Sequence, residues 1–323
     1  MKMLKLFLVF SLVVTANTQL LAQPEISIAK FAGNRAAAIS LTFDDGIQEH
    51  FTLVAPHLDR YGLKGTFGIN GKFIGDLDDS FAPRMTWEEC RKMAANGHEI
   101  NNHSWSHPNL YYTSPDSIKQ EIEKNDSAMM AELGFISRSV LYPFNCYNDT
   151  VLAISEKGKI GSRKFQYALG QRNSGCTAES VNQWLNDVVE KGEWGITMTH
   201  GIYTAWDQWD EPQILWNFFK KLYEMSDSIW VDTFANVQEY IKERDETKIS
   251  VHEDKNVFTV TLDCPLDSNL FDIPLTLKID KLPQSSSVKV IQDGKAIATC
   301  KKSGSIIADI NPHGGPITIK VSD

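Results

Sequence analysis

Strand-like and helix-like segments alternate along most of this chain, from about residue 35 to about residue 244. Ala37–Phe43 is a continuous apolar and β-branched run, which is typical of a strand buried on both faces. Thr86-Trp87-Glu88-Glu89 has the pattern of a helix capping box, and Ser114-Pro115 is a typical helix start. Because alternating strands and helices form a parallel sheet covered by helices, the pattern predicts an α/β fold, a complete or partial β/α barrel.

The other segments of this region follow from the same signals. Further strands are predicted at Gly65–Ile69, Val140–Tyr142, Gly195–His200 and Ile229–Val231. The first two helices are expected to end at Asn96-Gly97 and Gly134, and further helices are predicted at Ser180–Val189, Pro212–Met225 and Ala235–Arg244. In such a barrel the chemistry lies at the C-terminal ends of the strands, so residues that follow strands are the first site candidates.

After about Lys248 the pattern changes to short strand-like runs separated by turns such as Asp293-Gly294. The predicted strands are Val257–Leu262, Leu275–Ile279, Val288–Gln292, Ile306–Ile310 and Ile317–Val321. This pattern indicates a small all-β module, a sandwich-like domain. We therefore divide the chain into a barrel over residues 23–247 and a β-sandwich-like C-terminal domain over residues 248–323, which by default has a role in shape alone.

The N-terminus has the composition of a secretory signal. Lys2 and Lys5 precede the apolar run Leu6–Val14, which is too short to span a bilayer. Ala22 offers a small residue for cleavage, which predicts a signal peptide over residues 1–22; cleavage after Ala16 and an uncleaved anchor are the alternatives. We expect an exported protein, periplasmic or secreted, that is not an integral membrane protein after cleavage.

The formal net charge of −9 argues against nucleic acid as a partner, because phosphate binding needs clustered lysine and arginine. Five cysteines lack Cys-x-x-Cys spacing, so a structural zinc site built on cysteines is not expected. Cys264 and Cys300 both lie in the C-terminal region and are candidates for a disulfide. The alternative is that all five are small buried side chains.

Two adjacent carboxylates end the first predicted strand, in Thr42-Phe43-Asp44-Asp45-Gly46. Such a pair is costly unless a positive charge lies beside it, and a divalent metal meets that need. One carboxylate can then bind the ion, while the other acts as a base on a water that the ion holds. The alternative is an ordinary turn, for which Asp-Asp-Gly is also suited.

Three histidines lie at the ends of two other predicted strands, the strand-like run Glu99-Ile100-Asn101 and the strand that ends at His200. His103 and His107 are four residues apart, a spacing that suits a zinc ion, although a pair of surface or packing histidines has the same spacing. His200 follows the apolar strand residues Ile196–Thr199, and an imidazole at this place is suited to protonate a leaving group. The alternative for His200 is a hydrogen-bonded histidine at the barrel rim.

Together these motifs resemble the polysaccharide deacetylase family, also called NodB-like or carbohydrate esterase family four. The resemblance covers about Ala36 to Val237 and includes Thr-Phe-Asp-Asp-Gly, the run Gly97–His107, a proline–aromatic turn and the histidine-ended strand. It implies a distorted β/α barrel with a divalent metal, most often Zn²⁺. It also implies hydrolysis that removes N- or O-linked acetyl groups from a carbohydrate or polysaccharide.

The resemblance assigns roles by position. Asp45, His103 and His107 would hold the metal, Asp44 would be the general base, and His200 would be the general acid. The turn at Pro143-Phe144 would present the backbone N–H of Phe144 to the oxyanion, and Ser104 would brace the histidine loop. A base and an acid that start in opposite protonation states predict a bell-shaped pH profile.

The proline–aromatic turn is the family's third motif, and in this chain it differs from the usual pattern at two positions. Leu141 and Asn145 stand where the family usually has an arginine and a glycine, and that arginine normally orients the base. Arg163, or alternatively Arg172, is the candidate to pair with the base instead, since arginine suits a fixed pairing with a carboxylate. The family's fourth motif is an aspartate with an aromatic residue, and no aspartate occurs between residues 163 and 175 of this chain.

Trp105, Trp206 and Trp209 are candidates to line a sugar-binding cleft, although buried tryptophans more often belong to a core. Two other functions remain open. One is a carbohydrate-binding relative with impaired catalysis, which the departing motif favours. The other is hydrolysis of a non-acetyl C–N amide bond.

Overall fold

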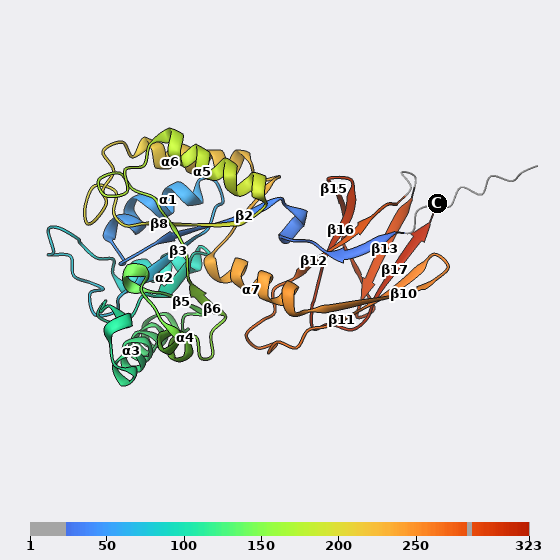
Figure 1. Cartoon of the computed structure of the whole chain (residues 1–323), viewed down its shortest axis with the longest axis horizontal. Helices are drawn as coiled ribbons and strands as arrows, with labels where there is room; N and C mark the ends of the chain where they lie inside the picture. Colours follow the sequence, from blue (N-terminus) through green and yellow to red (C-terminus); the bar gives the residue numbers. More distant parts are fainter. Residues whose placement is uncertain (1–23, 283–285, 323) are drawn as a thin grey trace, which may run out of the picture.

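The computed structural model describes residues 24–282 and 286–322 (Figure 1). The expected signal peptide at residues 1–22 lies outside this described part. Within it, no helix combines the length and the apolar character needed to cross a bilayer.

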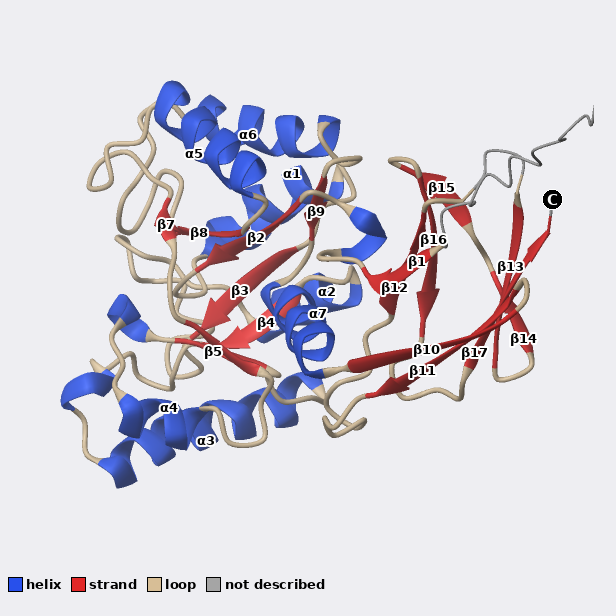
Figure 2. Ribbon diagram, turned by 45° about the vertical axis from the view of Figure 1, so that its right-hand side comes forward, coloured by secondary structure: helices blue, strands red, loops and turns tan. Residues whose placement is uncertain are grey.

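A curled parallel sheet forms the centre of the first domain (Figure 2). Its order is β6-β5-β4-β3-β2-β8-β7, and β9 also pairs with β2. The strands are β2 (Ala37–Phe43), β3 (Gly65–Ile69), β4 (Glu99–Asn102), β5 (Ser139–Leu141), β6 (Gly161–Arg163), β7 (Tyr167–Ala168), β8 (Trp194–Thr199) and β9 (Ile229–Val231). The order ends at β6 and β7, which do not pair with each other in the described residues. The predicted β/α barrel is therefore confirmed in a distorted, open form.

The central strand β2 explains why the sheet can form around it. All seven of its residues are buried, as the continuous apolar run predicts. Strand β8 pairs along residues 38–43 of β2. Since that edge is filled, β3 and β9 share the opposite edge, at residues 41–43 and 37–39 respectively.

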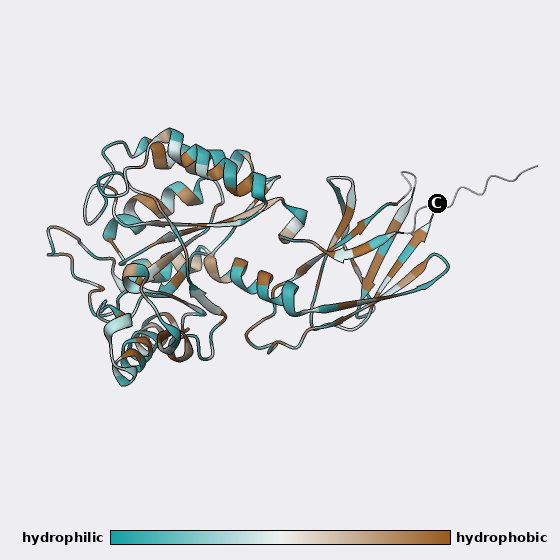
Figure 3. Cartoon of the chain, in the orientation of Figure 1, coloured by the Kyte–Doolittle hydropathy of each residue, from teal (hydrophilic) through white to brown (hydrophobic). Residues whose placement is uncertain are grey.

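Helices cover the outside of this sheet (Figure 2). They are α1 (Ala55–Asp59), α2 (Trp87–Ala95), α3 (Pro115–Leu133), α4 (Asp149–Ser155), α5 (Ala178–Lys191), α6 (Gln213–Glu224) and α7 (Phe234–Glu246). The capping box at Thr86 is present, and Gly134 ends α3 with a left-handed φ of 82°. Hydrophilic and hydrophobic residues mix along the helices, which bury one face each (Figure 3).

Shorter elements complete the barrel domain. A π-helical turn at His50–Val54 leads into α1, and 3₁₀ turns lie at Ala32–Asn34, Leu110–Tyr112 and Pro143–Asn145. The sequence patterns did not predict α1, α4, β6 or β7, each of which has seven residues or fewer.

The C-terminal domain consists of two antiparallel sheets, which confirms the predicted all-β module. Their orders are β1-β12-β16-β15 and β10-β11-β17-β13-β14. The strands are β1 (Glu25–Ile28), β10 (Lys248–Asp254), β11 (Val257–Asp263), β12 (Leu275–Asp280), β13 (Ser287–Gln292), β14 (Lys295–Ile297), β15 (Cys300–Lys302), β16 (Ser305–Ile310) and β17 (Ile317–Ser322). Side chains of both sheets, such as Leu277 and Ile319, share one hydrophobic core.

The two domains are joined through a common core and not only through the chain. Strand β1, from the segment that we assigned to the barrel, pairs with β12 of the C-terminal domain. Tyr240 of α7 donates a hydrogen bond to the carbonyl oxygen of Ala29 at 2.8 Å. Trp230 and Val237 of the barrel belong to the same hydrophobic cluster as the sandwich residues. The position of α7 between the domains is visible in Figure 1.

The disulfide considered between Cys264 and Cys300 does not form. All five cysteines, which lie in the described residues, are free thiols. Cys264 follows β11 in one sheet, whereas Cys300 begins β15 in the other sheet, so the two thiols belong to separate layers.

Candidate active site

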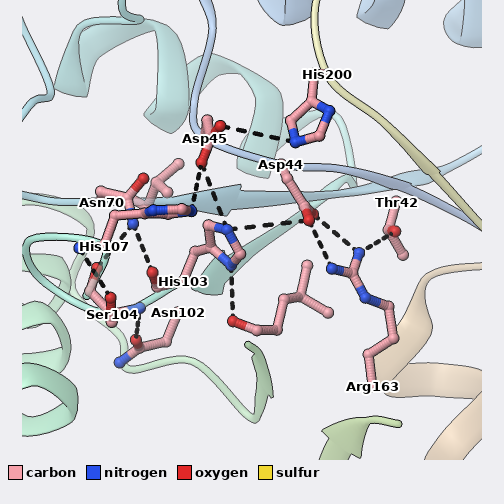
Figure 4. Close-up of polar contacts among 12 residues, drawn as sticks. Thr42, Asp44, Asp45, Asn70, Asn102, His103, Ser104, His107, Arg163 and His200 are labelled. Atoms are coloured by element: carbon pink, nitrogen blue, oxygen red, sulfur yellow. Dashed lines mark hydrogen bonds and ion pairs between the residues drawn. The ribbon is translucent and has the colours of Figure 1, made fainter. Parts of the chain in front are cut away.

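Asp44 and Asp45 lie at the C-terminal end of β2, at the buried centre of the barrel (Figure 4). Each residue is 4% exposed. The backbone N–H of Asp44 donates to the carbonyl oxygen of Thr199 at 3.0 Å, which continues the pairing with β8 past the strand end. Asp45 and Gly46 then adopt left-handed φ angles of 78° and 65°. This sharp turn separates the two carboxylates, so that they face different partners.

His103 is held in one ring orientation by the backbone. Its Nδ1–H donates to the carbonyl oxygen of Leu141 at 2.7 Å, which leaves Nε2 free. That Nε2 lies 3.5 Å from Oδ1 of Asp45 and 3.9 Å from Oδ2 of Asp44. Burial opposes a charged ring, but the carboxylates of Asp44 and Asp45 outweigh it and raise the pKa of His103.

The loop from His103 to His107 is fixed by short polar contacts. Ser104 Oγ accepts a hydrogen bond from the backbone N–H of His107 at 3.1 Å. The N–H of Ser104 in turn donates to Oδ1 of Asn102 at 2.9 Å. Both Ser104 and His107 have left-handed φ angles, 64° and 58°, so the contacts hold a strained turn. Ser104 thus links two residues of the histidine loop through its side chain.

Asp45, His103 and His107 bring three ligand atoms together within 4.8 Å of one another. Nε2 of His107 lies 3.3 Å from Oδ1 of Asp45. That Oδ1 is buried and has no hydrogen-bond partner among the described residues. Burial, and then the nearby His103, lower the pKa of His107 to about 4, so its ring is neutral and can act as a ligand. One carboxylate and two imidazoles therefore fit a divalent cation such as Zn²⁺.

Asp44 is paired with Arg163 from the end of β6. Nη1 lies 2.9 Å from Oδ1, and Nη2 lies 2.6 Å from Oδ2. Arg163 is fully buried, and its Nη1 also donates to Oγ1 of Thr42. Burial alone would raise the pKa of Asp44, but Arg163 and then His103 outweigh it and lower that pKa. Arg172, the other candidate, is exposed and pairs with Asp210 instead.

His200 follows β8 and borders the same site. Its Nε2 lies 3.9 Å from Oδ2 of Asp45, and 23% of its side chain is exposed. His50 Nε2–H donates to the carbonyl oxygen of His200 at 2.8 Å and so holds the strand end. Nδ1 of His200 is buried without a hydrogen-bond partner among the described residues. Within residues 24–282 and 286–322, no carboxylate therefore pairs with Nδ1 of His200, where the fourth motif of the family would supply one.

A cleft of about 570 Å³ opens over these residues. Asp44, Asp45, His103, His107 and His200 all line it, which brings together the catalytic and metal-binding candidates. Phe144 also lines the cleft; it is 64% exposed, and its ring lies 4.7 Å from the His107 ring. The Pro143–Asn145 turn gives Phe144 a left-handed φ of 57°.

The three candidate tryptophans have different environments. Trp206 lines the cleft with its side chain partly exposed. Trp209 does not: it is 2% exposed and packs in the hydrophobic core of the barrel, because the loop turns between these two positions. Trp105 lies outside the lining and packs against Lys124, whose Nζ is 4.5 Å from the ring centroid.

Two residues of the site region carried no signal in the sequence. Arg84 lines the cleft, donates to the carbonyl oxygen of Asp45 and lies 5.6 Å from the Trp206 ring. Glu49 accepts hydrogen bonds from the backbone N–H groups of Ile202 and Tyr203, at 2.7 and 3.0 Å. These contacts anchor the loop that follows His200. Neither residue belongs to a motif, so only the folded arrangement reveals it.

The fold and the site define a β/α-barrel protein with a candidate divalent-metal site at the C-terminal ends of its strands. Residues 32–160 match the family model described as polysaccharide deacetylase. This match agrees with the resemblance to the polysaccharide deacetylase family that the motifs indicate.

Individual proteins show the same similarity. A chitin deacetylase from Pestalotiopsis sp is 30% identical over 122 residues, 38% of this chain and 38% of that protein. A peptidoglycan-N-acetylglucosamine deacetylase from Bacillus cereus is 26% identical over 168 residues, 51% of each chain. The chain thus spans about half or less of these curated relatives. A Mycobacterium smegmatis structure assigned to the polysaccharide deacetylases has a TM-score of 0.54 at 16% identity, covering 71% of this chain and 98% of that one.

Proposed function

We propose that this protein is a divalent-metal-dependent hydrolase that removes acetyl groups from a carbohydrate. The observation that carries the proposal is the pair of carboxylates with separate partners in one cleft. Asp45 converges with two histidines, whereas Asp44 is held by Arg163. A site that only bound sugar would not need a buried carboxylate kept ionised beside a metal-ligand set.

Asp45, His103 and His107 would hold the cation, and Zn²⁺ is the expected one given two imidazole ligands and one carboxylate. When bound, the cation supplies a Lewis acid for the acetyl carbonyl and for the attacking water.

Asp44 would act as the general base. Arg163 keeps it ionised and fixes both of its oxygens, so it can take the proton from a water as that water attacks the acetyl carbon. His200 would then donate a proton to the departing nitrogen or oxygen of the sugar as the acetyl bond breaks. The backbone N–H of Phe144 would stabilise the oxyanion. The products are acetate and the free amine or hydroxyl.

Two relatives in the comparison act, by name, on chitin and on peptidoglycan N-acetylglucosamine. We therefore place N-acetylated glycans first among substrates, and we propose that Trp206 stacks against a sugar ring. An O-acetyl ester is the second candidate, because Nδ1 of His200 has no carboxylate partner among the described residues. Expulsion of an amine requires protonation of its nitrogen, whereas an alcohol leaves with less help from an acid, so ester hydrolysis depends less on how His200 is supported. Export, through the N-terminal signal, is part of the same proposal.

Acetate release from a panel of glycans tests this function. The panel contains chitooligosaccharides, peptidoglycan fragments and acetylated xylan, each with Zn²⁺ and with a chelator. Metal-dependent release from the first two would support N-deacetylation, and release from xylan alone would support ester hydrolysis. Metal binding without acetate release from any glycan would instead support a carbohydrate-binding relative.

A further inference from the structure

A second group of metal-ligand side chains lies at the seam between the two domains, away from the cleft. Glu243 is in the last turn of α7, Cys264 directly follows β11, and His313 lies in the turn between β16 and β17. One ligand atom from each lies within 4.8 Å of the other two. Oε1 of Glu243 and Nε2 of His313 are 3.7 Å apart.

Glu243 gives the second, independent observation. Its side chain is completely buried, and neither carboxylate oxygen has a hydrogen-bond partner among the described residues. By contrast, both carboxylate oxygens of the nearby Glu239 have hydrogen-bond partners. They accept from Arg138 and from the backbone N–H groups of Asp272 and Ile273. A buried carboxylate without a partner is costly, and a cation would remove that cost.

We propose that Glu243, Cys264 and His313 form a second divalent-metal site, distinct from the site in the barrel. A thiolate, an imidazole and a carboxylate select a borderline-soft ion of the Zn²⁺ class, not Ca²⁺ or Mg²⁺. Tetrahedral Zn²⁺ holds its ligand atoms about 3.5 Å apart, so no pair in the group has to contract by more than about 1.3 Å. The spacing of Glu243 and His313 already matches this geometry.

The ring of His313 is positioned for this role by the backbone. Its Nε2–H donates to the carbonyl oxygen of Phe271 at 2.8 Å. An ion at this point would replace the ring proton, and the same carbonyl oxygen would then stand beside the ion as a further oxygen donor. Phe271 itself packs against Ala235 of α7, which fixes the position of this carbonyl.

The site would act as a clamp between domains. One ligand comes from the barrel helix α7, and two come from the C-terminal domain, so a bound ion stabilises only the docked arrangement. None of the three residues lines the catalytic cleft. The proposal therefore does not depend on the proposed deacetylase function.

Titration of the metal-depleted full chain with Co²⁺ tests the proposal. Only a site with a thiolate gives the sulfur-to-cobalt charge-transfer band in the near ultraviolet, and the barrel site has no sulfur ligand. We expect the band in the wild type and in Cys300→Ser, a matched control at an exposed free thiol, and its loss in Cys264→Ser. His313→Gln should weaken Co²⁺ binding, followed by this band, at least tenfold. Even the mutation of residues that only support metal ligands lowers metal affinity by about 10–100-fold.

Three results would refute the proposed site. They are the absence of the band in the wild type at saturating Co²⁺, its survival in Cys264→Ser, and an equal loss of the band in Cys264→Ser and Cys300→Ser. Because Cys264 is only partly buried, its replacement by serine leaves the fold intact, which circular dichroism checks. Zn²⁺ should also raise the Tm of the wild type by more than that of Cys264→Ser. An equal rise in both proteins would contradict the clamp.

Discussion

Arg163 contacts both carboxylate oxygens of Asp44 from a fully buried position at the end of β6 (Figure 4). This two-point contact fixes the orientation of Asp44 and holds its pKa below the ordinary value. It also separates the roles of the two adjacent carboxylates, since Asp45 has no such contact and faces the histidines. The relationship explains how the Asp44 carboxylate is held in place although the family's usual arginine is replaced by Leu141.

Replacement of Arg163 should move the acidic limb of the pH–rate profile to higher pH. The pKa of Asp44 lies below its ordinary value of 3.8 because Arg163 stabilises the ionised form. Without the guanidinium that pKa should rise, so Asp44 should become protonated at a higher pH. Arg163→Lys keeps a charge but loses the two-point contact, so it should shift the limb less than Arg163→Met. Profiles of kcat/KM against pH for the three proteins measure this, and an unmoved limb in Arg163→Met would contradict the assignment.

The same pair should affect stability in a defined pH range. Because the folded pKa of Asp44 is lowered, its contribution is fully present above the unfolded value near 3.8 and is lost as the pH falls below it. Arg163→Met should be less stable at neutral pH by about 3–5 kcal/mol, the usual cost of breaking a buried pair. The difference should shrink below pH 4, which denaturant unfolding at several pH values can show. A constant difference would mean that lost packing, not the ion pair, causes the effect.

His200→Gln should discriminate between leaving groups. If His200 donates the proton to the departing group, its loss should slow amide hydrolysis by about 10²–10⁴-fold. Hydrolysis of an activated phenyl acetate, whose leaving group needs no proton, should change far less. The measurement is kcat on both substrates, with bound metal determined in parallel. Equal losses on the two substrates, with metal retained, would exclude a general-acid role.

Alanine substitution should affect glycan binding at Trp206 and stability at Trp209. Trp206 lines the cleft, so Trp206→Ala should raise KM for the glycan while it changes stability by less than about 0.5 kcal/mol. Trp209 is buried in the core, so Trp209→Ala should cost about 3–5 kcal/mol of unfolding free energy. Thermal melts and initial rates on both variants give the comparison. A stability loss in Trp206→Ala as large as that in Trp209→Ala would remove Trp206 from the cleft.

The sequence predicted the parts of the site that depend on local pattern. A continuous apolar run followed by Asp-Asp-Gly fixes both β2 and the turn that carries Asp44 and Asp45. The capping signals of α2 and α3 are likewise local, and both helices begin where these signals stand. Such features need no knowledge of the remainder of the chain.

The features of the fold and the site that the sequence did not predict depend on tertiary contacts. Strand β6, Gly161–Arg163, has three residues and no apolar pattern, so only its pairing with β5 brings Arg163 to Asp44. Trp206 and Trp209 are three residues apart in one loop, and no periodicity tells which of them faces the core. The pairing of β1 with β12 joins residues 25–28 to residues 277–280, a separation that a local pattern cannot indicate.

Acetate release and bound metal, measured together on the wild type, Asp44→Asn and Asp45→Asn, test the central claim most directly. Asp44→Asn should bind as much metal as the wild type and release acetate from an N-acetylated glycan about 10²–10⁴-fold more slowly. Asp45→Asn should bind one equivalent less and lose activity with it. Metal-loaded wild type that releases no acetate, or Asp44→Asn that releases it at the full rate, would contradict the account.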